Sequence, residues 1–251
     1  MTSPDLVAFD LDDTLAPSKG AIDPRIASLL LALLERVDVA IISGGNETQF
    51  RSQVIARLGK IDEAAAARLH LLPTCGTRYL RYDGADFSPV YAQDLTAEQK
   101  AGALAALREE AERLGLWEAE PWGDILEDRG SQITFSALGQ KAPHDAKRDW
   151  DPSGAKRGSL RDAVAARLPD LEVRSGGSTS IDITLAGIDK AYGMRQLAEH
   201  TGIPLTSMLF YGDRLDEGGN DYPVLAIGVP SVAVEGWEDT ADKLDALLPT
   251  L

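Results

Sequence analysis

Two aspartates, Asp10 and Asp12, stand one residue apart directly after an apolar run, and a hydroxyl residue, Thr14, follows them. The apolar run at 6–9 predicts a strand that is buried on both faces of a parallel sheet, whose carboxyl end is where such sheets bind ligands. Carboxylates this close repel each other, and a divalent cation that prefers oxygen ligands, such as Mg2+, would relieve the repulsion. The alternative is that such an aspartate only caps a helix or a turn.

A second polar segment follows the next predicted strand. The buried strand over 37–42 runs into Ser43, Gly44 and Gly45, and a helix is expected over 47–58. A hydroxyl and bare backbone N–H groups at the start of a helix could hold a phosphate. Taken alone, this segment is explained better by a simple capped turn, with Ser43 or Asn46 as the cap.

A third group of polar residues stands near the end of the chain. Lys190 begins a predicted helix, the strand predicted over 208–211 ends in Gly212 and Asp213, and an acidic loop leads to Asp221. Taken one at a time, Lys190 could be a solvated surface lysine and Gly212-Asp213 a common turn. The acidic loop could resemble a calcium-binding loop or simply be solvated. In one parallel sheet, however, all three polar groups would meet at the same edge.

Phosphoryl transfer through a covalent aspartyl intermediate is the chemistry that these residue types fit. One carboxylate would attack phosphorus, and another would give a proton to the leaving oxygen and later take one from the acceptor. A cation and a lysine would offset the charge on the phosphate oxygens. The order and placement of the whole set support this interpretation more than any single residue does.

Composition limits the possible partners. The chain has 251 residues and a net charge of −15, which argues against nucleic acid or an anionic membrane as a partner. Its single cysteine, Cys75, excludes a disulfide framework or a cysteine-based zinc site. The start of the chain lacks a secretory signal and no apolar stretch is long enough for a membrane span, so we expect a cytoplasmic protein.

Two different orders of predicted strands and helices indicate two domains. Residues 1–93 and 187–251 alternate strands and helices, as in a parallel α/β sheet, and end with a strand or two over 223–229 and a helix from Thr240. Residues 94–186 have a long helix and alternating strands, which favour an inserted α+β domain. A single irregular domain is the alternative.

The combination of these motifs resembles the haloacid dehalogenase (HAD) superfamily. Its four motifs are similar to Asp10-x-Asp12-x-Thr14, Ser43, Lys190 and Gly212-Asp213 with Asn220-Asp221. The insertion between the second and third motifs is similar to the branch with a large α/β cap (Cof-type, IIB). Within that branch the chain resembles the eukaryotic-type phosphomannomutases, in segments that include Arg129-Gly130, Gly176-Gly177 and Ser180-Ile-Asp182.

The resemblance implies a Rossmann-like core with a cap, and Mg2+-dependent phosphoryl transfer between mannose 1-phosphate and mannose 6-phosphate. It implies that Asp10 is the nucleophile and Asp12 the general acid and base. Phosphate would be held by Ser43, Gly44 and Lys190. The implied Mg2+ ligands are Asp10, Asp12 through its backbone oxygen, Asp213 and Asp221.

In the cap, the resemblance implies that the substrate, a small phosphorylated sugar, is bound by Arg129, Lys147, Ser180 and Asp182. It also implies a homodimer formed through the cap.

Three positions depart from the mutase pattern. Asp13 stands where the mutases usually carry Gly, Gln140 replaces a phosphate-binding Arg, and Lys147 replaces another. A lysine is a point charge and does not reproduce the fork of an arginine. The loss of the arginine at 140 favours an alternative, a sugar phosphatase that uses water as acceptor. A third reading, a non-catalytic sugar-phosphate-binding protein, is disfavoured by the four charged core residues.

Overall fold

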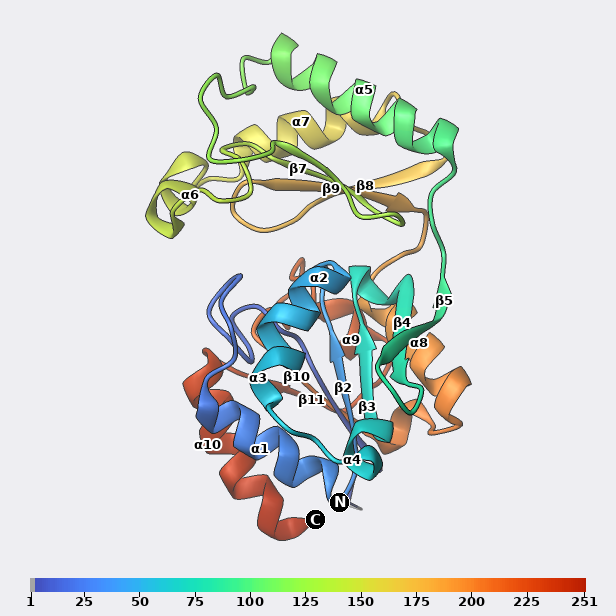
Figure 1. Cartoon of the computed structure of the whole chain (residues 1–251). Helices are drawn as coiled ribbons and strands as arrows, with labels where there is room; N and C mark the ends of the chain where they lie inside the picture. The colour runs from blue at the N-terminus through green and yellow to red at the C-terminus, as the bar shows by residue number, and fades with distance from the viewer. Residues whose placement is uncertain (1–2) are drawn as a thin grey trace. The chain divides into compact units, whose positions relative to one another are not determined.

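The computed structural model describes residues 3–251 and divides the chain into two compact units. We call Met1–Ala92 with Asp189–Leu251 the core unit, and Gln93–Ile188 the inserted unit (Figure 1). The roles of these units as a catalytic core and a cap stay predictions.

A seven-stranded sheet of order β11-β10-β1-β2-β3-β4-β5 forms the centre of the core unit. Its strands are β1 Leu6–Phe9, β2 Asp38–Ile42, β3 Leu69–Leu72, β4 Arg78–Tyr82, β5 Phe87–Ala92, β10 Met208–Gly212 and β11 Ser231–Ala233. The first five strands of that order run parallel, β4 pairs antiparallel with β3, and β5 pairs antiparallel with β4. The predicted α/β class is therefore confirmed.

Helices connect these strands. They are α1 Pro24–Leu34, α2 Glu47–Phe50, α3 Ala56–Leu58, α4 Glu63–Ala67, α8 Lys190–Thr201, α9 Tyr222–Ala226 and α10 Trp237–Leu247. The helix predicted over 47–58 is one helical stretch, because a π-helical turn over Arg51–Ile55 joins α2 to α3.

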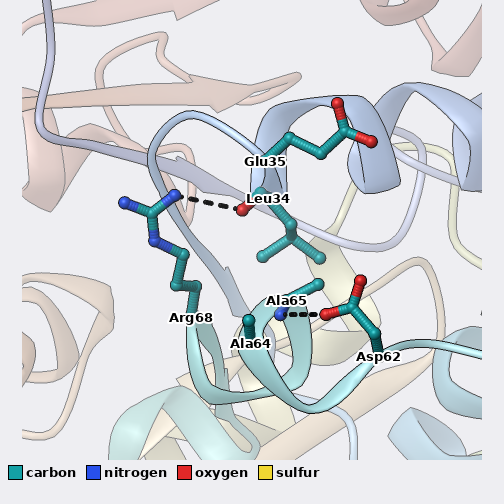
Figure 2. Close-up of a pocket in the computed structure, with 6 residues that line it drawn as sticks. All are labelled: Leu34, Glu35, Asp62, Ala64, Ala65 and Arg68. Carbon is teal, nitrogen blue, oxygen red and sulfur yellow. Dashed lines mark hydrogen bonds between the residues drawn. The ribbon is translucent and has the colours of Figure 1, made fainter.

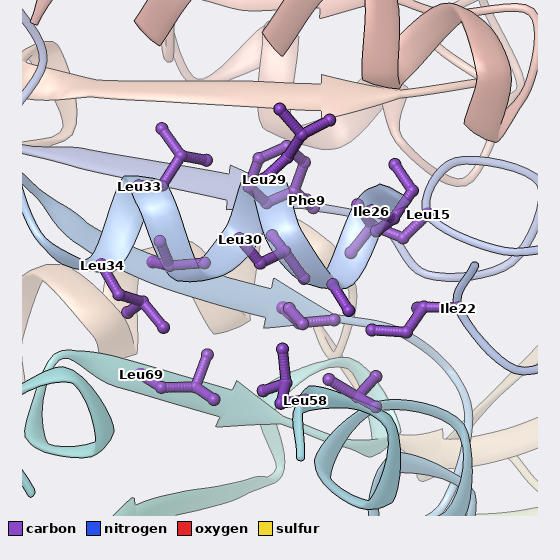
Figure 3. Close-up of a cluster of buried hydrophobic side chains, with 14 of the residues drawn as sticks. Phe9, Leu15, Ile22, Ile26, Leu29, Leu30, Leu33, Leu34, Leu58 and Leu69 are labelled. Carbon is purple, nitrogen blue, oxygen red and sulfur yellow. The ribbon is translucent and has the colours of Figure 1, made fainter. Parts of the chain in front are cut away.

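Helix α1 shows how the sequence builds this core. Asp23 accepts a hydrogen bond from the N–H of Arg25, and Pro24 occupies the first turn, where it costs no hydrogen bond. Ile26 and Leu30 then face Phe9 of β1 within the buried cluster of Figure 3. Full burial of a side chain of this size stabilises the fold by about 1.5–3 kcal/mol, so the apolar face of α1 anchors the strand that leads into Asp10.

Two predictions near the end of the chain were wrong. Residues 223–229, predicted to be a strand or two, begin with helix α9, and the strand β11 follows only at Ser231. Pro223 lies in the first turn of α9, a position that suits proline, whereas a central strand would need its missing N–H. The last helix starts at Trp237 rather than at Thr240.

The inserted unit has a four-stranded antiparallel sheet of order β6-β7-β9-β8. Its strands are β6 Leu126–Asp128, β7 Ile133–Ser136, β8 Leu171–Ser175 and β9 Ser180–Leu185, and its helices are α5 Ala97–Arg113, α6 His144–Trp150 and α7 Ala155–Ala165. The sequence did not predict the short helix α6.

The two faces of this second sheet differ in character. Phe135 and Ile183 pack with Leu107 of α5 and Leu160 of α7 in one apolar cluster. Side chains alternate along a strand, so the residues between them point to the opposite face, which is polar.

No helix within residues 3–251 is long and apolar enough to cross a membrane.

Candidate active site

Strand β1 lies between β10 and β2, and this position brings the predicted motifs together. Phe9 is the register partner of Tyr211 on one side and of Ile41 on the other. The N–H of Asp10 donates to the carbonyl of Tyr211 at 2.9 Å. Asp10, Ser43 and Asp213 therefore follow neighbouring strands at the same edge of the sheet, as the sequence predicted.

Lys190 forms two short ion pairs in the site. Its Nζ lies 2.7 Å from Oδ1 of Asp10 and 2.5 Å from Oδ1 of Asp221. Lys190 is 1% exposed, Asp10 3% and Asp221 0%. The lysine is the first residue of α8, where Asp189 caps the helix by accepting from the N–H of Tyr192 at 2.8 Å. A buried charge is tolerated only when it is paired, and these two carboxylates pair with Lys190.

The pKa values reflect this arrangement. Burial raises the pKa of Asp10 well above its usual value, and Lys190 opposes that shift. Burial alone would lower the pKa of Lys190, but Asp10 and Asp221 outweigh it and raise that pKa. Burial also raises the pKa of Asp213, with Asp221 adding to the shift. The site holds more carboxylate than its own cation neutralises, so an added cation would lower the pKa of both aspartates.

Three carboxylates form a group that fits a hard divalent cation. Oxygens of Asp10, Asp213 and Asp221 all lie within 4.8 Å of one another. Carboxylate oxygens are the ligands that Mg2+ prefers. Both oxygens of Asp221 are already held, one by Lys190 and the other by the N–H of Arg214 at 3.0 Å. Asp10 and Asp213 therefore suit direct coordination best, and Asp221 suits the orientation of Lys190.

Thr14 ties Asp213 to the first motif. The Thr14 Oγ1 accepts from the N–H of Asp213 at 3.1 Å and lies 3.4 Å from its Oδ1. Thr240 of α10 donates to the carbonyl of Thr14 at 2.7 Å. No sequence pattern predicts the role of Thr240, because its bond to Thr14 joins residues from nearly opposite ends of the chain.

Asp12 stands apart from the carboxylate group. Its Oδ1 accepts from the N–H of Lys19 at 2.5 Å. Burial raises the pKa of Asp12, which favours the protonated form that a general acid needs. Its predicted metal contact would use the backbone oxygen and stays a prediction.

Asp13 explains one departure from the mutase pattern. Its φ is +59°, in the left-handed region that Gly adopts freely and that Asp tolerates better than most residues. Its Oδ1 accepts from the N–H of Ser18 at 3.1 Å. Asp13 is exposed, and it adopts the same left-handed backbone conformation that Gly would have in this turn. Its carboxylate therefore adds no reacting group to the site.

Ser43 lies at the predicted edge but is held by its own turn. Its Oγ accepts from the N–H of Gly45 at 3.1 Å, and its carbonyl accepts from the N–H of Cys75. Within the part of the chain that the structure describes, Ser43 and Lys190 are not hydrogen-bonded to each other. Gly44 has open space where a side chain would be. A phosphate held by Ser43, Gly44 and Lys190 stays a prediction.

Two glycines explain why the fourth motif has its sequence. A Cβ on Gly212 would lie 2.5 Å from Oδ2 of Asp221, and one on Gly219 would lie 2.1 Å from the carbonyl of Arg214. The loop closes by a bond from the N–H of Asp221 to that same carbonyl at 3.1 Å. The glycines therefore allow the backbone to fold tightly around Asp221.

The predicted substrate residues of the inserted unit have partners within that unit. Arg129 donates to Oε2 of Glu127 through Nε and Nη2, at 3.0 and 2.8 Å. Lys147, on α6, donates to the carbonyl of Gln140 at 3.2 Å. The binding of a substrate by Arg129, Lys147, Ser180 and Asp182 stays a prediction.

Asp182 and Ser180 lie on the polar face of β9. The Oδ1 of Asp182 accepts from Gln132 Nε2 at 2.8 Å and from Thr134 Oγ1 at 2.7 Å. Gln132 and Thr134, which support Asp182, were not predicted from the sequence. The alternation of polar and apolar residues over 132–138 was the signal that could have found them.

A pocket of about 430 Å3 lies away from this site. It is lined by Leu34, Glu35, Asp62, Ala64, Ala65 and Arg68 (Figure 2). These residues precede the amino ends of β2 and β3, whereas α/β sheets bind ligands at the carboxyl ends. Arg68 donates to the carbonyl of Leu34 at 3.2 Å, and Asp62 caps α4. These contacts are structural.

The fold and the buried Lys190 with its carboxylates define an enzyme of the HAD superfamily. The chain belongs to the eukaryotic phosphomannomutase family, whose family model matches residues 120–250. Phosphomannomutase 2 of Dictyostelium discoideum is 21% identical over 239 residues, which cover 86% of this chain and 84% of the relative. A probable phosphomannomutase of Caenorhabditis elegans is 24% identical over 267 residues, with complete coverage of both chains.

Solved structures share the fold at lower identity. A truncated, IMP-bound IMP-nucleotidase of Plasmodium falciparum has a TM-score of 0.72 and 14% identity, over 99% of this chain and 69% of that one. A haloacid dehalogenase-like hydrolase from Bacteroides thetaiotaomicron has a TM-score of 0.64 and 15% identity, over 98% and 100%. This likeness concerns the fold alone.

Proposed function

We propose that this chain catalyses Mg2+-dependent phosphoryl transfer on a hexose phosphate, with Asp10 as the residue that is phosphorylated. The observation that carries the proposal is Lys190, fully buried between Asp10 and Asp221 at 2.7 and 2.5 Å. Burying three charges is costly, and only a function that needs them together explains their presence. The same cost disfavours a non-catalytic sugar-phosphate-binding protein.

In the first half-reaction, the carboxylate of Asp10 attacks phosphorus. Within residues 3–251, its contacts are made by Oδ1, with Lys190 and with the N–H of Leu11 at 2.7 Å. Oδ2 is thus the oxygen that forms the new O–P bond. The bond from phosphorus to the sugar oxygen breaks, and Asp12, whose pKa is raised, gives that oxygen its proton.

In the second half-reaction, Asp12 takes a proton from the acceptor oxygen, which attacks phosphorus and releases Asp10. Lys190 offsets negative charge beside Asp10 in both halves, and Ser43 with the N–H of Gly44 would hold phosphate oxygens. Mg2+, when held by Asp10, Asp12 and Asp213 with Asp221 beside them, would supply a positive charge that polarises the phosphoryl group.

The acceptor distinguishes two candidate activities. If it is a second hydroxyl of the sugar, the enzyme is an isomerase that interconverts mannose 1-phosphate and mannose 6-phosphate, as the names of its relatives suggest. If it is water, the enzyme is a sugar phosphatase. Gln140, which replaces an arginine of the mutase pattern, favours the second candidate. A small phosphorylated sugar as partner, a homodimer through the cap and a cytoplasmic location stay predictions.

The test is a product assay with mannose 1-phosphate, Mg2+ and a trace of a hexose bisphosphate. Mannose 6-phosphate and inorganic phosphate are followed together. We expect product of either kind from the unmodified protein and neither from Asp10→Asn. If the Asp10→Asn protein keeps its turnover, or if no phosphate ester of any kind is turned over with Mg2+, the proposed function is wrong.

A further inference from the structure

A turn with an uncommon backbone conformation follows β3 in the core unit. Thr74, Cys75 and Gly76 have φ values of +50°, +55° and +86° in succession. The N–H of Thr77 donates to the carbonyl of Thr74 at 3.2 Å and closes the turn. Turns with positive φ normally carry Gly, Asn or Asp, and a β-branched residue in this conformation is an outlier. We call residues 74–77 the left-handed turn.

Two buried hydroxyls lock the left-handed turn. Thr77 Oγ1 donates to the carbonyl of Thr74 at 2.9 Å, and the two threonine hydroxyls lie 2.6 Å apart. A hydroxyl has one proton, and that of Thr77 goes to the carbonyl, so Thr74 donates in the second bond. Thr74 is 0% and Thr77 1% exposed. Backbone strain of this kind persists only where the surrounding structure fixes it, and it clusters at functional sites.

One side of the left-handed turn holds the loop that follows β2. The N–H of Cys75 donates to the carbonyl of Ser43 and the N–H of Thr74 to the carbonyl of Gly45, both at 2.9 Å. Successive N–H groups point the same way in a helical turn but alternate in a strand, so a turn lets two neighbours bind one loop. A peptide unit is planar and trans. The bond to the Ser43 carbonyl therefore also fixes the direction of the N–H of Gly44.

The other side of the left-handed turn packs against α8. A Cβ on Gly76 would lie 2.4 Å from Cα of Gly193, and a Cβ on Gly193 would lie 2.9 Å from the carbonyl of Cys75. The two backbones are therefore in direct contact, which the two glycines allow. Lys190 begins the same helix three residues before Gly193. The left-handed turn thus contacts both the loop that carries Ser43 and the helix that carries Lys190.

We propose that the left-handed turn is a positioning element of the candidate active site, which sets the separation between the Ser43 loop and Lys190. The inference rests on the proposed function and deepens it, because both segments are expected there to hold the transferred phosphoryl group. Thr74 and Cys75 act through the backbone that they hold in place. Since a misplacement of about 1 Å can cost about a hundred-fold in rate, a turn that cannot relax maintains the geometry that the reaction needs.

Cys75→Gly tests the inference, because glycine can keep the positive φ but also frees the turn to leave it. We expect kcat to fall about ten-fold for a hexose monophosphate and equally for phenyl phosphate, an ester without sugar hydroxyls, because one phosphoryl site serves both. The melting temperature should change little, since relief of strain offsets the added freedom of the unfolded chain. The matched control is Cys75→Asn, which tolerates positive φ without that freedom and should keep the kcat of the unmodified protein.

Thr74→Val provides a second arm, because it removes one hydroxyl of the lock and keeps the β-branched shape. We expect a lower melting temperature and, at assay temperatures well below it, a kcat that is reduced several-fold. Thr74→Ser keeps the hydroxyl and should restore both values. If the turn were merely structural, Thr74→Val would lower the melting temperature and leave the kcat of the folded protein unchanged.

Hydrogen exchange without substrate reports on the positioning itself. In Cys75→Gly, peptides that cover residues 43–46 and α8 should exchange at least about ten-fold faster than in the unmodified protein. Unchanged exchange, or an unchanged kcat in both Cys75→Gly and Thr74→Val, would overturn the inference and leave the proposed function standing. If the unmodified protein turns over no ester, the proposed function is wrong and the catalytic role of the turn falls with it, even where faster exchange shows that the turn holds the loop.

Discussion

The site at the end of β1 and the polar face of the inserted unit both gather charged side chains, but they balance charge differently. In the core unit, Lys190 lies against Asp10 and Asp221, with Asp213 close by. In the inserted unit, Arg129 has its own partner in Glu127, as Arg174 has in Glu172.

The difference indicates that the two regions bind different parts of the substrate. An excess of buried carboxylate is unfavourable until a cation arrives, so the core site is suited to Mg2+ and, with it, to a phosphoryl group. A carboxylate that two side chains hold in place, as Gln132 and Thr134 hold Asp182, would suit the recognition of neutral hydroxyls. We therefore expect changes in the core site to affect every substrate, and changes in the polar face to affect only substrates that carry hydroxyls.

The largest effect is expected for Asp10→Asn. The amide cannot attack phosphorus, so turnover of every ester should fall by roughly three orders of magnitude or more. The control is Asp13→Asn, an exposed neighbour at φ +59° where Asn is tolerated equally well. It should keep the activity of the unmodified protein. Equal losses in both variants would mean that the turn, rather than the nucleophile, had been damaged.

Mg2+ should stabilise the core unit in a pH-dependent way. Burial holds the pKa values of Asp10 and Asp213 above the ordinary 3.8, so the metal-free fold is favoured below that value and loses stability as the pH rises through the raised values. At about one hundred times its Kd, Mg2+ would add about 2.7 kcal/mol.

The measurement is the melting temperature with and without Mg2+. Since Mg2+ competes with protons for the carboxylates, the increase should be larger near about pH 7 than near about pH 5. An increase that is the same at both values would argue against a carboxylate site.

Gly193→Ala should damage the core site through packing. A Cβ there would lie 2.3 Å from Cδ1 of Ile42 and 2.9 Å from the carbonyl of Cys75, so α8 must move away from the turn it packs on. We expect a loss of about 1–3 kcal/mol in the free energy of unfolding, by analogy with other overpacked positions. Activity should fall as well, because α8 carries Lys190.

The matched control is Gly158→Ala in α7, where a Cβ meets no atom within 4 Å. That change should instead stabilise the protein by about 0.5–1 kcal/mol. Chemical denaturation of both variants measures the two effects. Stabilisation by Gly193→Ala would show that the close approach of α8 is not as described.

The smallest effect is expected for Ser136→Ala. Ser136 lies on the polar face of the inserted unit, and its buried hydroxyl has no hydrogen-bond partner in the described part of the chain. Its removal should leave the melting temperature unchanged or slightly higher. The same change should raise KM for a sugar monophosphate a few-fold and leave phenyl phosphate unaffected. A clear loss of stability with no change in KM would assign Ser136 a purely structural role.

The sequence predicted the core site better than the inserted unit for a physical reason. Asp10, Ser43 and Asp213 each follow a buried strand, and the parallel sheet then brings them to one edge whatever the details of packing. Lys190 could be placed because it begins a helix. The contact between Thr240 and Thr14 could not, since no local pattern joins residues so far apart in the chain.

The errors lie where local patterns are ambiguous. A short apolar run such as 223–229 fits a strand or a helix, and only the turn chemistry at Pro223 distinguishes them. Helix α6 lacks a side-chain cap and has no buried residue, so it left no periodic signal. The alternation over 132–138 places Thr134 on a polar face, but its pairing with Asp182 depends on the register of β7 and β9, and the bond from Gln132 to Asp182 on the fold of the chain beside β7.

Mass spectrometry of the protein quenched in acid during turnover tests the central claim most directly. The protein would be mixed with a sugar monophosphate and Mg2+, digested, and searched for a peptide that carries one added phosphoryl group. The account predicts that group on Asp10, and its absence without Mg2+ or in Asp10→Asn. Steady turnover with no phosphoryl group on Asp10, or with the group on another residue, would contradict it.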